Sequence, residues 1–430
     1  MTPDAFFSLK EKHLIHGRKY RSIELAPTQR RETHVDSAAL YWDPYDARFA
    51  ADPWPVWKRM REEAPLYYND KHDFYAITRF ADVERAYTFP ETFSSSRGSI
   101  LELIKADLEI PPGTLIFEDP PVHDIHRKLI ARIFSPRRIG ALEPLVRQFC
   151  VDCLDPLAGQ QRFDLIEVLG AEMPMKVIGM LLGIPESGQA AFREQADAKL
   201  RTEDGGKIDT SDGIVITHEA LGDYIDWRVQ HPSDDVITEL LTTEFEDETG
   251  VTRTLTRDEV MMYVTVLAGA GNETTGRLIG WMASTLALHP AQRAELVADP
   301  ALIPGAVEEV LRLEPPGPFD GRYVRQDVEF HGQTVPAGSA ILLVIGAANR
   351  DPERYQDPDT FDIRRKVGLH LTFAIGPHYC LGAALARLEG RIALEEILRR
   401  WPSWEVDWDE AKLQQTSSVR GWERLPLLVG

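Results

Sequence analysis

The sequence predicts a mainly α-helical protein with small β-sheets, an α+β fold. Long amphipathic segments dominate after residue 120, and strand patterns are short and confined to residues 64–78 and 321–345. No repeat, low-complexity tract or Gly/Ser linker interrupts the chain of 430 residues. We therefore expect one large domain over residues 41–430. Residues 1–40 form an N-terminal extension whose role the sequence does not indicate.

The composition narrows the class of protein. The chain carries 48 Lys and Arg against 68 Asp and Glu, a formal net charge of −20, which opposes binding to nucleic acid or to anionic membranes. No apolar run approaches the roughly 18 residues that span a bilayer, and the first residues lack the apolar segment of a secretory signal. Three cysteines do not make a disulfide framework. We expect a soluble cytoplasmic protein.

The clearest single element is a long helix that begins after Thr256 and ends before His289-Pro290. Thr256 and Glu259 have the spacing of a capping box, and His289-Pro290 is a stop signal. The apolar pattern covers most sides, so we expect the helix to pass through the middle of the protein. Two glycines lie at its centre, although a glycine costs roughly 1 kcal/mol relative to alanine inside a helix. We therefore expect that a requirement other than helix stability keeps the space beside these two glycines free of side chains.

Small residues and a hydroxyl share one face of this helix. Thr274 is four residues after Ala270 and three after Gly271, with Leu267 a turn earlier. Glu273 adjoins this notch, and a carboxylate beside a threonine can pass protons if water reaches both. The same pattern fits close helix packing with Glu273 in a structural salt bridge. The residues alone leave both interpretations open.

A third interpretation of the same stretch is a dinucleotide-binding loop at Gly269-x-Gly271. That fingerprint needs a glycine where Thr274 stands, and a strand ending near residue 268 has no use for the capping box. The helix is therefore the better prediction.

The stretch LTFAIGPHYCLGAALARLEGR, residues 371–391, places Cys380 between Gly376 and Gly382. An apolar stripe starts directly after the cysteine and predicts a helix whose N-terminus favours the thiolate, the metal-binding form; the stripe consists of Leu381, Leu385, Leu388 and Ile392. The two glycines suit a loop that lies flat against a large planar ligand, and His378 could point to an anionic edge of that ligand. The alternative for Cys380 is a small buried apolar side chain.

Two further patterns are interpreted as having no role in chemistry. Cys150 and Cys153 form C-x-x-C in a helical pattern, but no second pair or nearby histidine completes a zinc site, so we expect packing residues. His126 is interpreted as a surface residue, because its spacing from His123 fits a metal pair only weakly.

Two motifs carry a family resemblance. Phe373-x-x-Gly376-x-His378-x-Cys380-x-Gly382 resembles the haem-binding loop of the cytochrome P-450 monooxygenases of the soluble bacterial type. The long helix is similar to the same family, because Ala270-Gly271-x-Glu273-Thr274 resembles its oxygen-binding groove.

A third match lies between them, where Glu309-x-x-Arg312 resembles the family's buried ion pair that braces the cysteine loop. The resemblance runs from about residue 40 to the C-terminus. It implies a single cytochrome P-450-type body with a long central oxygen-binding helix. One departure is Ala374, since many members have a glycine in that turn.

The resemblance implies roles for particular residues. Cys380 becomes the iron ligand of haem b, Thr274 and Glu273 the catalytic proton carriers, and Glu309 and Arg312 the structural support. The implied cofactor contacts are His123, Arg127, Ala270, Gly271, Arg322, Phe373, Gly376, His378, Cys380 and Gly382. The implied substrate pocket includes Leu267, Ala270, Gly317, Phe319 and Val419, with parts of residues 93–118 and 170–215. Arg97 could anchor a substrate carboxylate.

The implied reaction inserts one atom of O2 into a hydrophobic small molecule: a terpenoid, steroid, fatty acid or aromatic compound. Electrons would come from NAD(P)H through a ferredoxin reductase and a ferredoxin, and a monomer is expected. Four arginines after Cys380 form either a basic docking patch for that partner or a solvated helix face; they are Arg387, Arg391, Arg399 and Arg400.

Alternatives to this function stay open. They are a haem-binding sensor or carrier without turnover, a peroxide-driven haem-thiolate enzyme, and a nicotinamide or flavin oxidoreductase built around residues 269–276.

Overall fold

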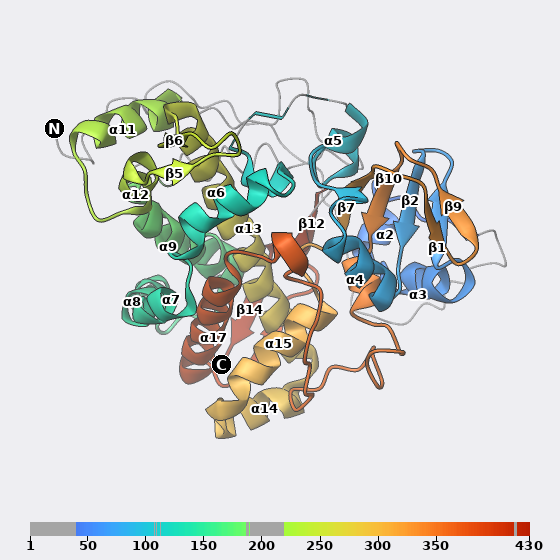
Figure 1. The fold of residues 1–430 in the computed structure, drawn as a ribbon. Coiled ribbons are helices and arrows are strands. Elements are labelled where there is room, and N and C mark those ends of the chain that lie inside the picture. Colours follow the sequence, from blue (N-terminus) through green and yellow to red (C-terminus); the bar gives the residue numbers. More distant parts are fainter. Residues whose placement is uncertain are drawn as a thin grey trace.

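The computed structural model describes residues 40–106, 108, 110–111, 113–185, 189, 219–416 and 419–430. Within them a helical body and a five-stranded sheet lie side by side (Figure 1). The mainly helical fold with small sheets that the sequence predicts is confirmed. The predicted extension lies outside the described residues apart from residue 40, so the boundary at this point stays a prediction.

Helices make up the body around the site. Those before the long central helix are α2 (Ala47–Ala51), α3 (Trp54–Glu63), α4 (Phe80–Thr88), α5 (Leu101–Ala106), α6 (Val122–Ala131), α7 (Pro136–Ala141), α8 (Glu143–Leu154), α9 (Glu172–Leu182), α11 (Glu219–Gln230) and α12 (Val236–Thr242). Those after it are α14 (Pro290–Ala298), α15 (Ile303–Leu313), α16 (Ile345–Ala348) and α17 (Ala383–Arg400). Single turns lie at η2 (Leu115–Phe117), η3 (Asp155–Leu157), η4 (Ile166–Gly170), η5 (Pro300–Leu302) and η6 (Gly376–His378).

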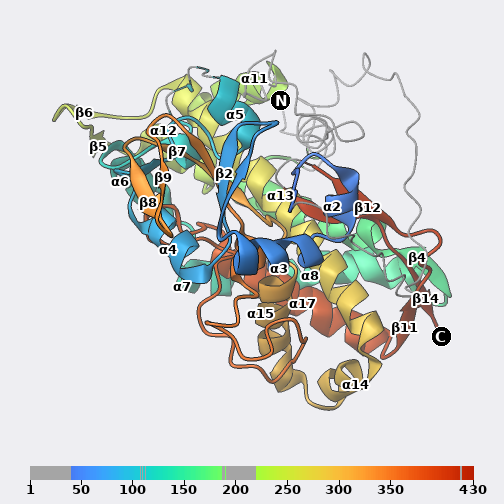
Figure 2. The same cartoon turned by 90° about the vertical axis from the view of Figure 1, so that its right-hand side faces the viewer.

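The central helix α13 (Arg257–Leu288) is the predicted long helix. Thr256 is its N-cap, and both hydrogen bonds of the capping box with Glu259 are present, which explains why the helix begins where it does. His289 is its C-cap. The helix passes through the middle of the body, packed against α9, α15 and α17 (Figures 1 and 2). It is mostly buried along its length, as its apolar pattern predicts.

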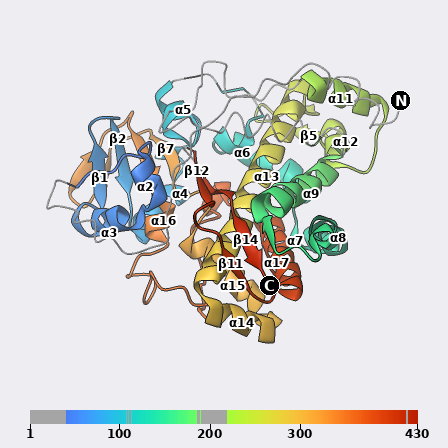
Figure 3. The same ribbon diagram turned by 180° about the vertical axis from the view of Figure 1, so that it is seen from behind.

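The main sheet lies beside the body, as the view from behind also shows (Figure 3). Its strand order is β1-β2-β10-β7-β3, and only the β10–β2 pair is parallel. The strands are β1 (Leu66–Asn69), β2 (Phe74–Ile77), β3 (Phe93–Ser94), β7 (Asp320–Val324) and β10 (Ala340–Leu343). Both predicted strand regions therefore contribute strands to this sheet, whereas β8 and β9 of the second region form a separate hairpin. Pairing of Arg322 with Ile341 of β10 fixes the strand position of this predicted site residue.

Smaller sheets complete the structure. The C-terminal strands are β11 (Trp404–Val406), β12 (Lys412–Gln415), β13 (Arg420–Arg424) and β14 (Pro426–Val429), and β4 (Arg162–Asp164) pairs with β14. Two hairpins are β5 (Phe245–Glu246) with β6 (Thr252–Arg253), and β8 (Val328–Phe330) with β9 (Gln333–Val335). Among the described helices, none combines the length and apolar character that crossing a bilayer requires.

Candidate active site

The loop before α17 holds Cys380 in a tight return. The Cys380 N–H donates to the Phe373 carbonyl at 2.8 Å, which closes the loop. Gly376 has a φ of +71°, and a Cβ there would lie 2.7 Å from the Tyr87 carbonyl oxygen, so both conformation and space require glycine. Ala374 has a φ of 52°. The turn where the sequence departs from the family pattern therefore does use a left-handed residue.

A cavity of about 370 Å³ lies between this loop and α13. One wall comes from α13, another from the loop and the start of α17, and a third from α6 and β7. Most of the predicted site residues meet here: His123, Arg127, Leu267, Ala270, Gly271, Thr274, Gly317, Arg322, Phe373, His378, Cys380 and Gly382. Residues more than 250 positions apart in the chain thus share one cavity.

The environment of the Cys380 thiol has two opposing parts. Burial raises the pKa of the thiol, whereas the N–H groups of Gly382 and Ala383 and the charge of Arg127 lower it. The sequence predicts only the lowering part, from the helix N-terminus. Burial outweighs it because the sulfur lies inside the cavity. A metal cation at the sulfur would favour the thiolate again, so the position fits a metal ligand.

Basic side chains gather at one end of the cavity. The rings of His123 and His378 lie 4.2 Å apart, and the Nε2 atom of each is buried without a hydrogen-bond partner among the described residues. Burial lowers the pKa of His378 to about 2, helped by the charges of Arg322, His123 and Arg127. An anionic ligand group would fit these two ring nitrogens, because its charge would favour a proton on each of them and its oxygens would accept their hydrogen bonds. The carboxylates of a haem have this chemistry.

The two arginines at this end are held by local contacts. The Arg322 guanidinium donates to the Asp320 carboxylate at 2.8 Å, and Arg127 donates to the Tyr379 carbonyl. Burial lowers the pKa of Arg127, and the Cys380 sulfur partly offsets this. Both guanidinium groups are thus positioned before any ligand is present.

The small residues of α13 serve two purposes. The Thr274 hydroxyl donates to the Ala270 carbonyl at 2.8 Å, and both residues line the cavity. Gly271 lines it too, but a Cβ there would also come 3.3 Å from Ile178 of α9. The groove and the close helix packing that the sequence left as alternatives therefore coexist at this place.

Glu273 lies on a different face from Thr274. It is buried, and Arg277 donates to its carboxylate at 3.0 Å. It lines a second, polar cleft of about 180 Å³ together with Asn272 and Gly276, and does not line the cofactor cavity. The predicted shared groove for Glu273 and Thr274 is therefore wrong, because successive helix residues are turned by about 100°.

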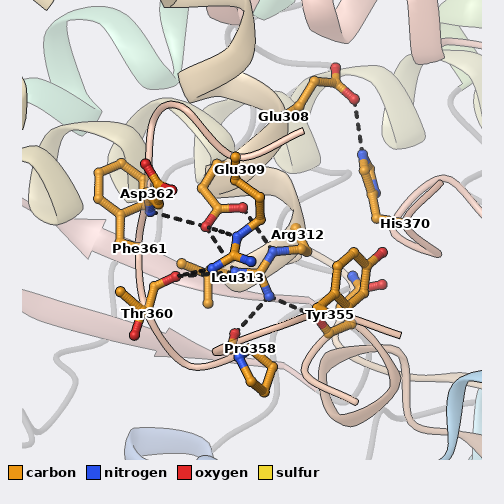
Figure 4. A network of polar contacts seen from close by, with 12 residues as sticks. Glu308, Glu309, Arg312, Leu313, Tyr355, Pro358, Thr360, Phe361, Asp362 and His370 are labelled. Carbon is orange, nitrogen blue, oxygen red and sulfur yellow. Dashed lines mark hydrogen bonds and ion pairs between the residues drawn. The ribbon is translucent and has the colours of Figure 1, made fainter. Parts of the chain in front are cut away.

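The helix pair Glu309 and Arg312 is fully buried. Arg312 donates two hydrogen bonds of 2.8 Å to Glu309 (Figure 4). It also donates to the carbonyls of Asn349 and Pro358 at 2.9 and 2.7 Å. The pair thus fastens α15 to the extended segment after α16.

That segment leads to the cysteine loop through Asn349. The Asn349 side chain donates to the Thr372 hydroxyl at 2.9 Å and accepts from the Leu371 N–H at 2.8 Å. Arg365 and the Asp362 N–H complete the shell of Glu309 at 3.0 and 3.1 Å. The bracing function that the resemblance implied has a continuous physical basis here.

Two predicted pocket residues lie elsewhere. Phe319 and Val419 do not line the cofactor cavity but border a small separate pocket, where the Phe319 ring packs against Trp42 at 5.7 Å. Phe319 turns away because β7 begins at the next residue and neighbouring strand residues face opposite sides. Part of the predicted 170–215 lining lies outside the described residues.

Two histidine and cysteine interpretations have clear outcomes. His126 is buried and its Nδ1 contacts the Glu118 carboxylate at 2.8 Å, so its interpretation as a surface residue is wrong. Cys150 is fully buried in α8, which confirms a packing role. Within the described part of the chain, no group of three or more His, Cys, Asp or Glu side chains is arranged to hold a metal ion.

The five other arginines that the sequence singled out contact side chains of the protein itself. Arg97 lies over the Tyr323 ring at 4.2 Å. The four arginines of α17 all form ion pairs: Arg387 with Glu308, Arg391 with Glu143 and Glu395, Arg399 with Glu396, and Arg400 with Asp155 and Glu396. Their charges are thus largely neutralised, which favours the solvated helix face over the docking patch.

Sequence reasoning missed several lining residues. Asp320, Thr372, Leu385 and Glu389 all border the cavity. Glu389 had a signal in the sequence, since it lies four residues after Leu385 and therefore on the apolar stripe of α17. Leu385 belongs to that stripe itself, whereas Asp320 and Thr372 gave no signal, because short strand and loop segments carry little periodicity.

The chain is similar to known proteins over almost its whole length. The family model described as Cytochrome P450 matches residues 209–420. Cytochrome P450 123 of Mycobacterium tuberculosis is 35% identical over 400 residues, covering 92% of this chain and 98% of that protein. Vitamin D(3) 25-hydroxylase of Pseudonocardia autotrophica is 33% identical, covering 90% of this chain and 96% of that protein. The solved structure of a P450 EryK mutant in complex with erythromycin B matches with a TM-score of 0.80 at 32% identity, covering 89% and 97%.

Proposed function

Because the chain belongs to the cytochrome P450 family of haem-thiolate monooxygenases, we propose that Cys380 is its iron ligand and that the cavity beside it is the active site. The observation that carries this proposal is the meeting of three chemistries in one cavity. They are the Cys380 sulfur, the Thr274 hydroxyl and two buried imidazoles whose Nε2 atoms have no hydrogen-bond partner among the described residues. When bound, the haem supplies the activation of dioxygen and the transfer of one oxygen atom.

His123, His378, Arg127 and Arg322 would hold the two haem carboxylates. Two of them are charged, and the other two present buried Nε2 atoms. Charge-assisted hydrogen bonds from such groups satisfy a carboxylate in a site shielded from water. Gly271, Ala270 and Gly382 would leave room for the flat faces of the ring.

Thr274 and Glu273 would handle protons from two sides of α13. The Thr274 hydroxyl can exchange its hydrogen bond to the Ala270 carbonyl for one to a group in the cavity. Glu273 faces the polar cleft, whose mouth carries the exposed carboxylates of Glu167 and Glu423. Arg277 would act as a positioning residue, since it pairs with Glu273 and donates to the Trp422 carbonyl. Protons would thus enter from the cleft and leave toward the cavity.

The substrate would be a hydrophobic small molecule that is hydroxylated or epoxidised. The cavity wall includes the apolar side chains of Leu115, Ile178, Val266 and Leu267. The name of one relative refers to vitamin D(3), and a structural neighbour holds erythromycin B. These support a terpenoid, steroid or macrolide, with a fatty acid or an aromatic compound as further candidates.

Electrons would come from NAD(P)H through a ferredoxin reductase and a ferredoxin, and the enzyme would work as a cytoplasmic monomer. P450 enzymes use redox partners in general. The four arginines of α17 are paired with carboxylates, so docking of the ferredoxin would depend on other local side chains.

The test uses purified holoprotein. The ferrous–CO complex of the wild type should show the red-shifted Soret band of thiolate ligation, and Cys380→Ser should lose it. Cys153→Ser, a half-buried cysteine of α8, is the matched control and should keep the band. An unshifted band in the wild type would contradict the assigned ligand.

A second set of experiments separates the remaining functions. A spectral screen for the low-to-high-spin shift would identify substrates. Product formation with NAD(P)H and a surrogate ferredoxin would favour the monooxygenase over a haem-binding sensor or carrier. Product formation with peroxide alone would favour a peroxide-driven enzyme.

A further inference from the structure

Glu389 is a buried carboxyl group to which the proposed reaction assigns no role. It lies on α17, has an exposed fraction of 1%, and lines the cofactor cavity together with Leu385 and Ala386. Its Oε2 atom is buried without a hydrogen-bond partner among the described residues. It lies six residues after Ala383, or about 9 Å along the helix axis. A carboxyl group without a visible partner thus borders the cavity that contains Cys380.

Glu389 has no charged partner among the described residues, where its Oε2 atom is buried without a hydrogen bond. Its neighbours in the cavity lining include the apolar side chains of Leu278, Leu385 and Ala386. The carboxyl group is therefore shielded from water without a compensating charge.

The charged groups on the helices around α17 are engaged elsewhere. On α13, Glu273 pairs with Arg277; on α15, Glu308 pairs with Arg387 and His370, and Glu309 pairs with Arg312. On α8, Glu143 pairs with Arg391 and Arg147 pairs with Glu395. Arg138 of α7 pairs with Glu239, Glu295 of α14 pairs with Arg364, and Arg293 of α14 donates to the Trp404 carbonyl. Arg137 of α7 is exposed.

Burial alone raises the pKa of Glu389, to about 8. A carboxyl group in such surroundings holds its proton at neutral pH, because its charged form cannot be solvated. It ionises when the pH rises through its own pKa. The cavity therefore gains a negative charge on the alkaline side of neutrality.

We propose that Glu389 couples proton uptake to the reduction of an iron centre in this cavity. As a neutral acid it leaves the reduction potential of that centre high, and as a carboxylate it lowers that potential. The proposal rests on the proposed function, since it requires an iron centre at Cys380. A negative charge in a poorly solvated cavity opposes the addition of an electron to the same cavity.

The coupled step balances in charge. In the holoprotein, one electron from the redox partner would reduce iron(III) to iron(II), and one proton from solvent would convert the Glu389 carboxylate to the acid. The total charge in the cavity is then unchanged. By linkage, reduction raises the proton affinity of Glu389 as much as ionisation lowers the reduction potential.

The experiment is a spectroelectrochemical titration of the full-length holoprotein from about pH 6 to about pH 9.5, a range that brackets the titration of a buried carboxyl group. The potential of the wild type should fall as the pH rises through about 8, the range in which Glu389 ionises. Glu389→Gln, which keeps the shape and stays neutral, should match the wild type at low pH and lie above it at high pH. Glu395→Gln on the same helix is the control, because that carboxylate does not line the cavity and is paired with Arg147 and Arg391. It should reproduce the wild-type curve.

Two results would overturn the proposal. One is a Glu389→Gln curve that superimposes on that of the wild type. The other, which needs no variant, is an infrared spectrum of the wild type near pH 6 without the carbonyl band of a protonated acid. A wild type without the thiolate-type ferrous–CO band would instead overturn the proposed function itself.

Discussion

Replacing Arg312 with leucine should destabilise the protein strongly. Its guanidinium is fully buried and donates to Glu309, Asn349 and Pro358. Without it, the equally buried Glu309 carboxylate keeps only Arg365 and the Asp362 N–H. Removing one partner of a buried ion pair costs about 3–5 kcal/mol, because the other charge is left uncompensated.

This free energy can be converted to a melting temperature. At about 2.1 cal/mol/K per residue, a chain of 430 residues unfolds with an entropy of about 0.9 kcal/mol/K. The expected fall in Tm is therefore about 3–6 °C. The assay is thermal unfolding of the holoprotein followed by circular dichroism, with cofactor absorbance as a second probe. Haem loss should accompany unfolding, since the pair supports the cysteine loop.

Two further variants make the reasoning refutable. Arg364→Leu removes an exposed arginine of the same segment, which pairs with Glu295; it should change the free energy of unfolding by less than about 1 kcal/mol. The double variant Glu309→Leu/Arg312→Leu should cost less than the sum of the single variants, because no uncompensated charge of the pair is left. Additive effects, or an Arg312→Leu variant as stable as Arg364→Leu, would refute the buried-charge argument.

Four other outcomes follow from single side chains. Thr274→Ala should keep consuming NAD(P)H and oxygen but release peroxide, with product formation reduced by at least about tenfold; full coupling of NAD(P)H to product would contradict its role. His378→Phe should weaken haem binding by about 1–3 kcal/mol through the loss of one donor, measured by haem transfer to an acceptor protein; unchanged retention would remove His378 from the haem site. Ala374→Gly should raise Tm by about 1 °C, because the residue has a positive φ; a lower Tm would show that the backbone is unstrained. Burial raises the pKa of Glu389 from 4.5 to about 8, so the folded state binds the extra proton and the wild type loses stability between these pH values; Glu389→Gln should avoid this loss of up to roughly 5 kcal/mol, and parallel stability–pH curves would contradict it.

The sequence predicts those parts of the fold whose signals are local. The bounds of α13 follow from Thr256, Glu259 and the His289-Pro290 stop, all of which act within one turn of the helix ends. Strands β1, β2, β7 and β10 of the main sheet follow from alternation, whereas β3 lies outside the predicted regions. The sheet of β11, β14 and β4 escaped prediction because it joins strands that are distant in the sequence. Arg162 of β4 pairs with Leu428 of β14, although the two residues are far apart in the sequence.

The site residues also divide into those that local sequence signals predict and those that tertiary contacts place. The glycines and the cysteine of the loop stand in one short segment, so their spacing alone indicates a cofactor loop. The directions of Phe319 and Val419 depend on strand register, and the burial of His126 depends on Glu118 and on packing from other elements. Tertiary contacts set these properties, and no single segment encodes them.

The position of Glu273 in its helix decides which cavity its side chain lines. Adjacent residues differ by about 100° around the axis, so Glu273 and Thr274 cannot both face one cavity. Helix α13 therefore separates two spaces: Glu273 lines the polar cleft on one side, and Thr274 lines the cofactor cavity on the other. The buried Glu273 carboxylate can then stay paired with Arg277 beside the polar cleft, while the Thr274 hydroxyl borders the other cavity. If both side chains carry protons as proposed, a proton passing from Glu273 to Thr274 would have to travel around the helix through water or a moving side chain.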